Sequence, residues 1–354
     1  MASVSWSSEN NDLRRQQERH RQGWKEDDEG VFIVLGNHFT ENEFRAAMRQ
    51  AESAPRWLDI DADAMRRDYN RSGFLVRHRL AEHPLFTADA LFRLCRRMPA
   101  GAVKHRFGTV PADTHFDSSI DRFRGDLTLD DALDHLVEKR AYVAIYNPEN
   151  DPEYRPVIEG FLAEIGLAAR PFERFFNWYS TYVFISAHDA VTPYHMDREM
   201  NFLLQIAGRK TVQLWDPRDD GVMRPEQRDH LFSFDPDARP TWHDGLPAKA
   251  RRFELEPGLG VHHPFIAPHL VTTGQNFSIS LAITYRTPHS DVMSDAHAFN
   301  DRLRPWGLGR IPVGRHAAVD AFKAQAMRGM RAAKDVLHRA HRDKDSSATA
   351  PRHS

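Results

Sequence analysis

The feature that most constrains the fold is a series of short strand-like segments between Trp178 and Thr287. Residues that favour turns, mainly Gly, Pro and Asp, separate these segments. The clearest of them read YSTYVFISA, NFLLQIAG, KTVQLWDP, RRFELEPG, GVHHPFIA and FSISLAITYRT. Several short strands with turn residues between them are typical of a β-sandwich, a jelly roll or a barrel. We therefore expect a mainly β core with helical flanks.

Helical patterns dominate the chain before this β region. Thr40 and Glu43 have the spacing of a capping box, which predicts a helix that begins after Thr40. Further elements are expected along the same part of the chain: a strand over 31–39, helices over 87–97, 129–139 and 157–167, and a strand over 140–147.

The C-terminal part becomes helical again, because apolar residues recur three or four positions apart. The residues of this stripe are Val319, Phe322, Ala326, Met330, Ala333 and Leu337. We expect an amphipathic helix that either packs within the chain or forms a homodimer interface. The chain then divides into a disordered or loosely ordered arm over 1–30, a helical N-terminal region with strands over 31–139, the β core over 140–287, and a C-terminal helical region with a frayed tail over 288–354.

Composition excludes several classes of protein. No apolar run approaches the roughly 18 residues that a membrane helix needs, and the N-terminus lacks the apolar core of a secretory signal. The formal net charge of −2 provides no basic field for nucleic acid, so no nucleic-acid partner is expected. The single cysteine, Cys95, cannot form an internal disulfide or a thiolate metal cluster. We expect a cytoplasmic protein.

The 20 histidines offer the chain's metal-binding chemistry. On a strand, residues i and i+2 point to the same face, so a His-x-Asp pair can present two ligands to one ion. This composition alone predicts roughly three His-x-Asp/Glu pairs by chance. The chain contains four pairs: His115/Asp117, His195/Asp197, His289/Asp291 and His341/Asp343. The spacing is therefore uninformative without its context.

Context separates one pair from the others. His195 ends an expected strand and is followed by two more strands, whereas the other three pairs lie in loops or in the charged tail. Downstream, His269 lies between two further expected strands. Together with Asp197 these residues give two imidazoles and one carboxylate, the facial triad that leaves positions open on a non-haem iron. His262 and His263 are nearby alternatives, but strand parity favours His269.

Several residues around this triad follow a further pattern of fixed spacing. A threonine precedes the first histidine by three positions, a lysine follows it by fifteen, an asparagine follows the aspartate by four, and a Pro-Gly precedes the second histidine. These residues are Thr192, Lys210, Asn201 and Pro257-Gly258, with an upstream Arg-x-Tyr at Tyr142. In this pattern the chain resembles JmjC-type 2-oxoglutarate/Fe(II) oxygenases of the cupin superfamily. It looks nearest to the asparaginyl hydroxylase that inhibits hypoxia-inducible factor.

The resemblance implies a double-stranded β-helix, or jelly roll, in which His195, Asp197 and His269 hold Fe(II). It also implies residues for the 2-oxoglutarate cosubstrate: Lys210, Thr192, Tyr142, Asn201 and Thr284. The expected activity is a dioxygenase that uses O2 and 2-oxoglutarate to hydroxylate a C–H bond. Its substrate would be a protein or peptide side chain, or a small amino-acid-like molecule.

The residues leave alternatives open. Two imidazoles and a carboxylate also suit Zn²⁺ or Mn²⁺, so an isomerase on the same fold, or a non-catalytic cupin-like binding or regulatory protein, remains possible. Lys210 is one of only eight lysines. The alternative to a role in cosubstrate binding is that it lies on a strand and faces solvent. A lysine retained at this position favours the oxygenase, since neither alternative needs it. Three departures from the family pattern line or adjoin the pocket and bear on the substrate: Leu259, Ala267-Pro268 and Thr284.

Overall fold

The computed structural model describes residues 24–26, 32–34, 36–99, 101–116, 119–126, 128–233, 238–307 and 311–348. The chain forms two compact units. The first runs to Val222 and resumes over Thr241–Pro288, and the second comprises Met223–Pro240 and the chain from His289 onward.

The first unit contains all of the described strands. They are β1 (Trp24–Glu26), β2 (Phe32–Val34), β3 (Asn37–His38), β4 (Leu58–Asp59), β5 (Leu75–His78), β6 (Val103–Arg106), β7 (Tyr142–Tyr146), β8 (Trp178–Ser186), β9 (Val191–His195), β10 (Met200–Ala207), β11 (Lys210–Leu214), β12 (Arg251–Leu255), β13 (Leu259–His263), β14 (His269–Thr273) and β15 (Ser278–Arg286). Its helices are α2 (Glu41–Ser53), α3 (Ala62–Asp68), α4 (Ala88–Arg97), α5 (Ser119–Arg122), α6 (Leu129–Asp134) and α7 (Arg155–Ala169).

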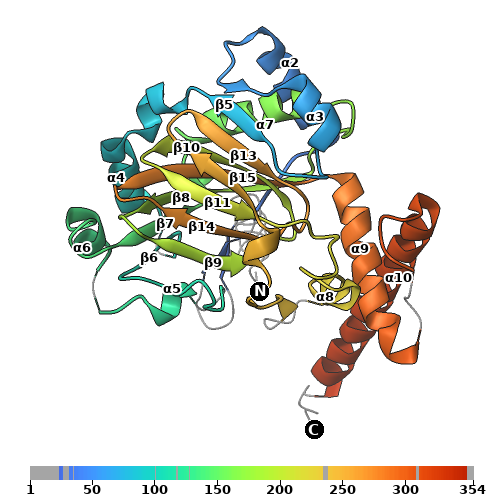
Figure 1. Ribbon diagram of the computed structural model, residues 1–354. Helices are drawn as coiled ribbons and strands as arrows, with labels where there is room; N and C mark the ends of the chain where they lie inside the picture. Colours follow the sequence, from blue (N-terminus) through green and yellow to red (C-terminus); the bar gives the residue numbers. More distant parts are fainter. Residues whose placement is uncertain are drawn as a thin grey trace, which may run out of the picture. The chain divides into compact units, whose positions relative to one another are not determined.

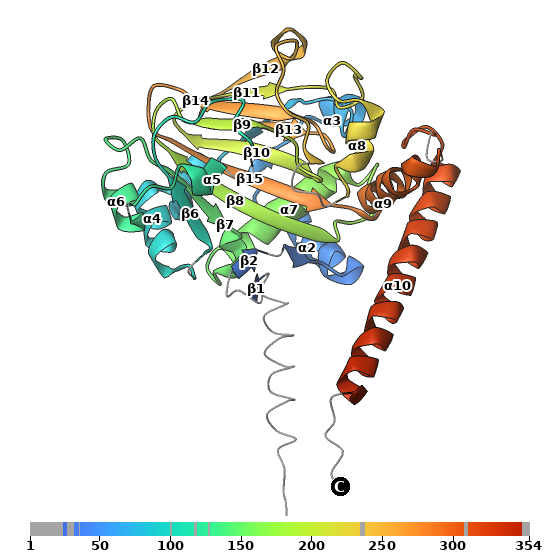
Figure 2. The same cartoon turned by 90° about the horizontal axis from the view of Figure 1, so that it is seen from below.

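Two antiparallel sheets build the core, as Figures 1 and 2 show. The larger sheet has the order β4-β5-β13-β10-β15-β8-β7-β6, with β3 also paired to β8, and the smaller has the order β12-β11-β14-β9. Buried side chains from both sheets meet in one cluster, which includes Leu203, Val261 and Ala282 of the larger sheet and Val212 and Val271 of the smaller. The jelly roll expected from the sequence is confirmed, and strands from the N-terminal region extend its larger sheet at both edges.

Register determines which side chains of the larger sheet point between the two sheets. Arg106, Tyr142 and Ser186 lie directly opposite one another on β6, β7 and β8. Near the opposite end of the strands, Asn201 of β10 lies opposite Thr284 of β15. Because side chains alternate between the two faces of a strand, both rows face the interior of the jelly roll.

The opposite, outer face of the larger sheet is covered by α2 and α7, which pack together (Figure 2). The hydroxyl of Tyr179 on β8 donates to Glu159 of α7 at 2.8 Å, and Phe176 stacks on Tyr285 of β15 with ring centroids 4.2 Å apart. The helices therefore bury one face of the sheet and leave the other to line the interior.

Gly208 makes the turn that places Lys210 at the start of β11. Its φ of +69° lies in the left-handed region that favours glycine. A Cβ at this position would lie only 2.1 Å from the backbone oxygen of Phe277, so no other residue fits without a shift of the backbone.

The second unit consists of α8 (Pro225–His230), α9 (Pro288–Leu303) and α10 (Ala317–Ala348). Asp229 of α8 bonds His297 and Arg304, and Asp295 of α9 bonds Arg328 of α10 at 2.6 Å. The apolar stripe expected on the last helix exists, but much of it faces solvent: Phe322 is 69% exposed and Val336, on the same side, is 65% exposed.

Most of the expected local structure is confirmed, including the capping box of Thr40 and Glu43. Two expectations were wrong in extent. The helix over 129–139 ends at Asp134, because the backbone turns at His135 and leads through turns into β7. The strand over 31–39 is broken into β2 and β3.

The two ends of the chain also differ from expectation where they are described. The expected loose arm over 1–30 contains β1, which pairs with β2, and the rest of the arm lies outside the described residues. The tail is helical to Ala348, beyond which it too lies outside them. Among the described residues, no helix is long and apolar enough to span a membrane.

Candidate metal centre

His195 and His269 lie directly opposite each other on the neighbouring strands β9 and β14. His269 is the first residue of its strand, rather than part of a loop between strands. Each Nδ1 donates to the carbonyl two residues earlier in the chain: that of Pro193 at 2.7 Å for His195, and that of Ala267 at 3.0 Å for His269. These bonds place the proton on Nδ1 and the lone pair on Nε2, which is the tautomer a metal ligand needs.

Asp197 follows β9 and brings its carboxylate to both imidazoles. Its oxygens lie 4.0 Å from Nε2 of His195 and 3.9 Å from Nε2 of His269. The three ligand atoms lie within 4.8 Å of one another. These separations are too long for hydrogen bonds, and they exceed the roughly 3 Å between neighbouring donors that share one ion at about 2.1 Å, so the three side chains must shift slightly inward to hold an ion. Two imidazoles and one carboxylate are a donor set that fits Fe(II).

Two rings enclose the imidazoles. Phe116 stacks face to face on His195, with ring centroids 3.7 Å apart and an interplanar angle of 1°. His263 of β13 approaches His269 with centroids 4.6 Å apart, and neither of its nitrogens has a hydrogen-bond partner in the described structure. Aromatic walls of this kind limit water around the triad.

Lys210 is buried, with 4% of its surface exposed, so its interpretation as a solvent-facing residue is wrong. Its ammonium donates to the hydroxyl of Ser280 at 2.6 Å and lies 5.6 Å from the centroid of the Phe184 ring. No carboxylate among the described residues pairs with it. Burial lowers the pKa of Lys210 to about 7, because nothing compensates the charged form. An anionic ligand would supply that compensation.

Tyr142 and Thr192 form a second part of this pocket. Their hydroxyls lie 3.5 Å apart, Tyr142 coming from β7 and Thr192 from β9. The ring of Tyr142 lies 5.9 Å from that of Phe184, the same ring that Lys210 approaches. Three of the residues expected to bind the cosubstrate, on three different strands, are thus linked through Phe184.

Asn201 and Thr284 lie farther along the larger sheet. They oppose each other on β10 and β15, and Asn201 also opposes His263 on β13. Both are buried, and Oδ1 of Asn201 has no hydrogen-bond partner within the described residues. Asn201 and Thr284 therefore add two buried polar side chains to the lining of the interior.

His262 is not part of the triad, as strand parity indicated. Its Nδ1 donates to the backbone oxygen of Asn201 at 3.1 Å, and its Nε2 accepts from the backbone nitrogen of Asn70 at 3.3 Å. With both ring nitrogens bonded to backbone, this histidine joins β13 to β10 and to the turn after α3.

Sequence reasoning missed Arg106. It lies on β6 opposite Tyr142, is 1% exposed, and its guanidinium carbon lies 4.3 Å from the centroid of the Tyr142 ring. The only local signal was a short segment, VKHRFG, which has no distinctive pattern. Pairing between strands brings this residue to the site, and such pairing is not readable from spacing along the chain.

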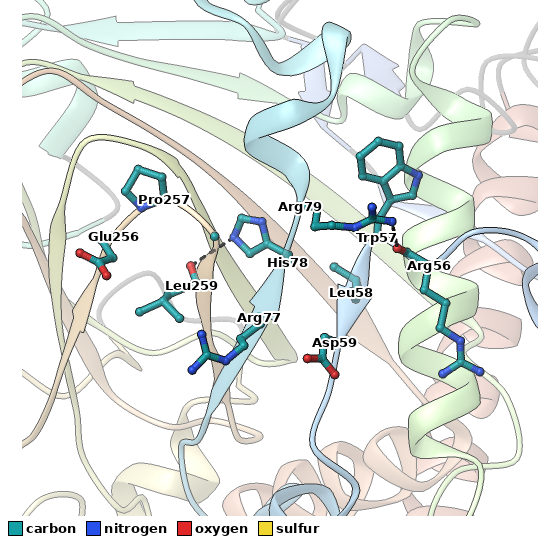
Figure 3. Close-up of a pocket in the computed structure, with 11 residues that line it drawn as sticks. Arg56, Trp57, Leu58, Asp59, Arg77, His78, Arg79, Glu256, Pro257 and Leu259 are labelled. Atoms are coloured by element: carbon teal, nitrogen blue, oxygen red, sulfur yellow. Dashed lines mark hydrogen bonds between the residues drawn. The ribbon is translucent and has the colours of Figure 1, made fainter.

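A separate cavity of about 540 Å³ lies at the edge of the larger sheet, between β4, β5 and the segment before β13 (Figure 3). Three arginines, Arg56, Arg77 and Arg79, contribute to its lining, together with Asp59 and Glu256. None of the triad or cosubstrate residues lines it. We therefore assign the chemistry to the interior of the jelly roll.

A family model for a cupin-like domain matches residues 100–291, just over half of the chain. Among solved structures, the ribosomal oxygenase YcfD from Escherichia coli matches with 15% identity and a TM-score of 0.39, over 77% of this chain and 66% of that one. The same protein in complex with cobalt and 2-oxoglutarate matches with 15% identity and a TM-score of 0.39, over 75% and 64%.

A more distant match is the DMSP lyase DddQ from Ruegeria pomeroyi, with 16% identity and a TM-score of 0.20, over 30% of this chain and 38% of that one. The chain thus spans about two thirds of the length of the YcfD chains that it matches. No curated protein sequence matches it significantly.

Proposed function

The chain belongs to the cupin-like domain family, and we propose that within this family it is an Fe(II)- and 2-oxoglutarate-dependent dioxygenase. One observation carries the proposal: Lys210, a buried cation without a carboxylate partner in the described structure, lies in the same interior as a His-Asp-His triad. A metal-binding protein or an isomerase needs the triad but has no use for such a lysine. A ketoacid cosubstrate with a second carboxylate uses both.

The overall reaction is R–H + O2 + 2-oxoglutarate → R–OH + succinate + CO2. Bound Fe(II) supplies the activation of O2 and the oxidising chemistry. The chain supplies the placement: His195, Asp197 and His269 hold the ion through three donors and leave its other positions to ligands.

The remaining residues bind and orient the cosubstrate. Lys210 provides a charge for its distal carboxylate, and the hydroxyls of Tyr142 and Thr192 offer neutral hydrogen bonds beside it. Asn201 and Thr284 line the interior farther along the sheet. Keeping one end of the cosubstrate fixed in this way orients its keto acid end toward the triad.

We propose a protein or peptide side chain, or a small amino-acid-like molecule, as the substrate. Release of succinate on addition of candidate peptides or amino acids distinguishes the two. We also propose a cytoplasmic location, in keeping with a single, buried, free cysteine, Cys95.

A homodimer through α10 is part of the proposal. The exposed side chains Phe322, Met330 and Val336 lie on one side of this helix, and an apolar stripe exposed in the single chain is suited to association with a second copy.

The decisive experiment is anaerobic. Fe(II) and then 2-oxoglutarate are added to metal-free protein, and the visible charge-transfer band of an iron–ketoacid chelate is recorded. We expect the band in the wild type, and in Lys210→Ala only at much higher 2-oxoglutarate concentrations. If Fe(II) binds and no band follows at any concentration, the protein is not a 2-oxoglutarate oxygenase, and the binding-protein or isomerase interpretation replaces it.

A further inference from the structure

Phe116 is the one phenylalanine, tyrosine or tryptophan among the described residues whose ring stacks on a ligand of the proposed metal centre. It lies face to face with the imidazole of His195, with ring centroids 3.7 Å apart and an interplanar angle of 1°. The side chain is half-buried, so its ring borders the site without being sealed into the core. A ring in this position is open to the chemistry that the bound metal performs.

The backbone holds Phe116 in this place. The segment between β6 and α5 passes beside β9 (Figures 1 and 2), and the carbonyl of Ala112 accepts from the backbone nitrogen of Tyr194 at 3.1 Å. The carbonyl of Phe116 accepts from the backbone nitrogen of Ser119, the first residue of α5, at 3.0 Å. Because Tyr194 immediately precedes His195, the segment and the ligand are fastened to the same part of β9. The stack therefore belongs to a fixed arrangement of the backbone.

The stack also determines how close the ring comes to a bound ion. A metal on Nε2 of His195 lies in the plane of the imidazole, about 2.1 Å from that nitrogen. With the parallel ring centred 3.7 Å from the imidazole centre, the ion lies about 4–6 Å from the centre of the Phe116 ring. The nearest ring carbons are closer still, so they lie beside the positions that the three ligands leave open.

We propose that Phe116 is a self-hydroxylation site: with Fe(II), O2 and 2-oxoglutarate present and no substrate in place, the protein converts this side chain into a hydroxyphenylalanine. The inference rests on the proposed function and extends it to a covalent modification of the chain itself. When no substrate C–H bond occupies the site, the ring C–H bonds of Phe116 are the ones held beside the oxidising centre.

The reaction has the balance of the proposed hydroxylation, Ar–H + O2 + 2-oxoglutarate → Ar–OH + succinate + CO2. One atom of O2 enters the ring and the other enters succinate. The ring and the ketoacid each supply two electrons, and the hydrogen displaced from the ring carbon is balanced by that of the new hydroxyl. Bound Fe(II) supplies the oxidising chemistry, and the chain supplies only the position of the ring.

Mass spectrometry tests the proposal, because trypsin releases Phe107 and Phe116 in one peptide, residues 107–122. The full chain is incubated in air with Fe(II) and 2-oxoglutarate, and the peptide is fragmented to locate an added oxygen atom. Phe107 is the internal control, since its ring packs edge-on against His105 rather than against the triad. Proximity to the ion predicts at least about tenfold more hydroxylation at Phe116 than at Phe107.

The controls separate this reaction from unspecific oxidation. Omission of 2-oxoglutarate, or replacement of Fe(II) by Zn(II), should abolish the modification, and isotopically heavy O2 should label the ring. In Phe116→Ala, measured at saturating Fe(II), the peptide should stay unmodified. An oxygen atom that still appears there would lie on another residue, such as His115, and would overturn the assignment.

A second measurement examines the geometry without turnover. In protein labelled with 4-fluorophenylalanine, the fluorine resonances that disappear in Phe116→Ala and in Phe107→Ala identify the two rings. A paramagnetic ion acts steeply with distance, so Co(II) should shift and broaden the Phe116 resonance relative to Zn(II). The Phe107 resonance should change much less.

The anaerobic chelate band described above separates the two possible failures. If the band forms and Phe116 is hydroxylated no more than Phe107, the modification is overturned and the oxygenase stands. Equal hydroxylation without 2-oxoglutarate overturns the modification in the same way, because iron and O2 alone then explain it. A Phe116 resonance that bound Co(II) leaves unchanged shows that the ring departs when metal binds, and overturns it too. If no band forms, the oxygenase falls and the modification falls with it.

Discussion

His195 and His269 lie opposite each other on the paired strands β9 and β14. Each fixes its imidazole through a hydrogen bond from Nδ1 to the carbonyl two residues earlier. The backbone of the smaller sheet therefore sets both rings before any ion binds. Asp197 completes the set from just beyond β9, with Oδ1 4.0 Å from Nε2 of His195 and Oδ2 3.9 Å from Nε2 of His269. Such preorganisation reduces the ordering cost of metal binding.

Removing the carboxylate should abolish tight metal binding. For Asp197→Ala we expect Fe(II) or Co(II) affinity to fall by more than about 100-fold, since loss of even a supporting residue costs 10- to 100-fold. Turnover should disappear while the fold persists, because Asp197 is partly exposed and lies in the loop between β9 and β10. Calorimetry and circular dichroism measure the two effects. Asp59→Ala, in the outer cavity, is the control; undiminished metal binding by Asp197→Ala would refute the triad.

The sequence was sufficient for the parts of the site that are close together along the chain. Thr192, His195 and Asp197 come from one strand and its end, and Lys210 starts β11, the second strand after it, behind a glycine turn. His195 and Asp197 followed from their spacing at the end of an expected strand, whereas the roles of Thr192 and Lys210 were implied by the resemblance to JmjC-type oxygenases. Short strands separated by turn residues predicted a sandwich, a jelly roll or a barrel, and the resemblance to JmjC-type oxygenases selected the jelly roll.

The remainder of the site depends on pairing between distant strands. Arg106 reaches the interior because β6 pairs with β7, and His263 faces Asn201 because β13 pairs with β10. No motif marks either residue, and register is set by the whole sheet. The helix expected over 129–139 was longer than the observed α6 for a related reason, since the chain must turn after Asp134 to enter β7.

Phe116 should contribute to the metal site through its stack on His195. In Phe116→Ala the imidazole loses the ring that limits its rotation and shields it from water, so metal should bind about 3- to 10-fold more weakly. Competition with a chromophoric chelator measures this loss. Phe172→Ala removes a 41% exposed ring outside the site and should have no effect. A wild-type affinity in Phe116→Ala would mean that the ring only covers the imidazole.

Glu149 predicts a pH dependence of stability. It is fully buried, accepts from Asn37 at 3.1 Å and from Thr181, and burial raises its pKa to about 7. Because the folded state binds this proton more tightly than the unfolded state, the stabilisation is present below pH 4.5 and is lost as pH rises to about 7.

Glu149→Gln mimics the protonated acid and tests this dependence. The unfolding free energy of the variant relative to wild type should rise by about 2–3 kcal/mol between pH 4.5 and 7.5, as determined by urea titration. Glu153→Gln, at an exposed position on the same loop, should show no such change. A constant difference between Glu149→Gln and wild type across this range would show that the carboxyl titrates normally.

The stripe on α10 makes the oligomeric state testable. Introducing a charge at the 69% exposed Phe322, as in Phe322→Glu, should convert a dimer into a monomer, because a buried unpaired charge is incompatible with an apolar interface. Light scattering coupled to size exclusion measures the mass. The charge-neutral control is Gln325→Ala, at an exposed position on the same helix. A wild type that is monomeric at micromolar concentrations would contradict the proposed dimer.

Lys210 should make cosubstrate binding depend on pH. Its ammonium must be charged to bind a carboxylate, and burial lowers its pKa to about 7 in the ligand-free protein. Since the carboxylate raises that pKa in the complex, affinity for 2-oxoglutarate should be highest below pH 7 and fall up to tenfold per unit above it. Calorimetry on the metal-loaded protein between pH 6 and 9 gives the slope. Lys210→Arg keeps its charge throughout and should flatten it. A flat profile in the wild type would mean that Lys210 is already charged and paired without the ligand.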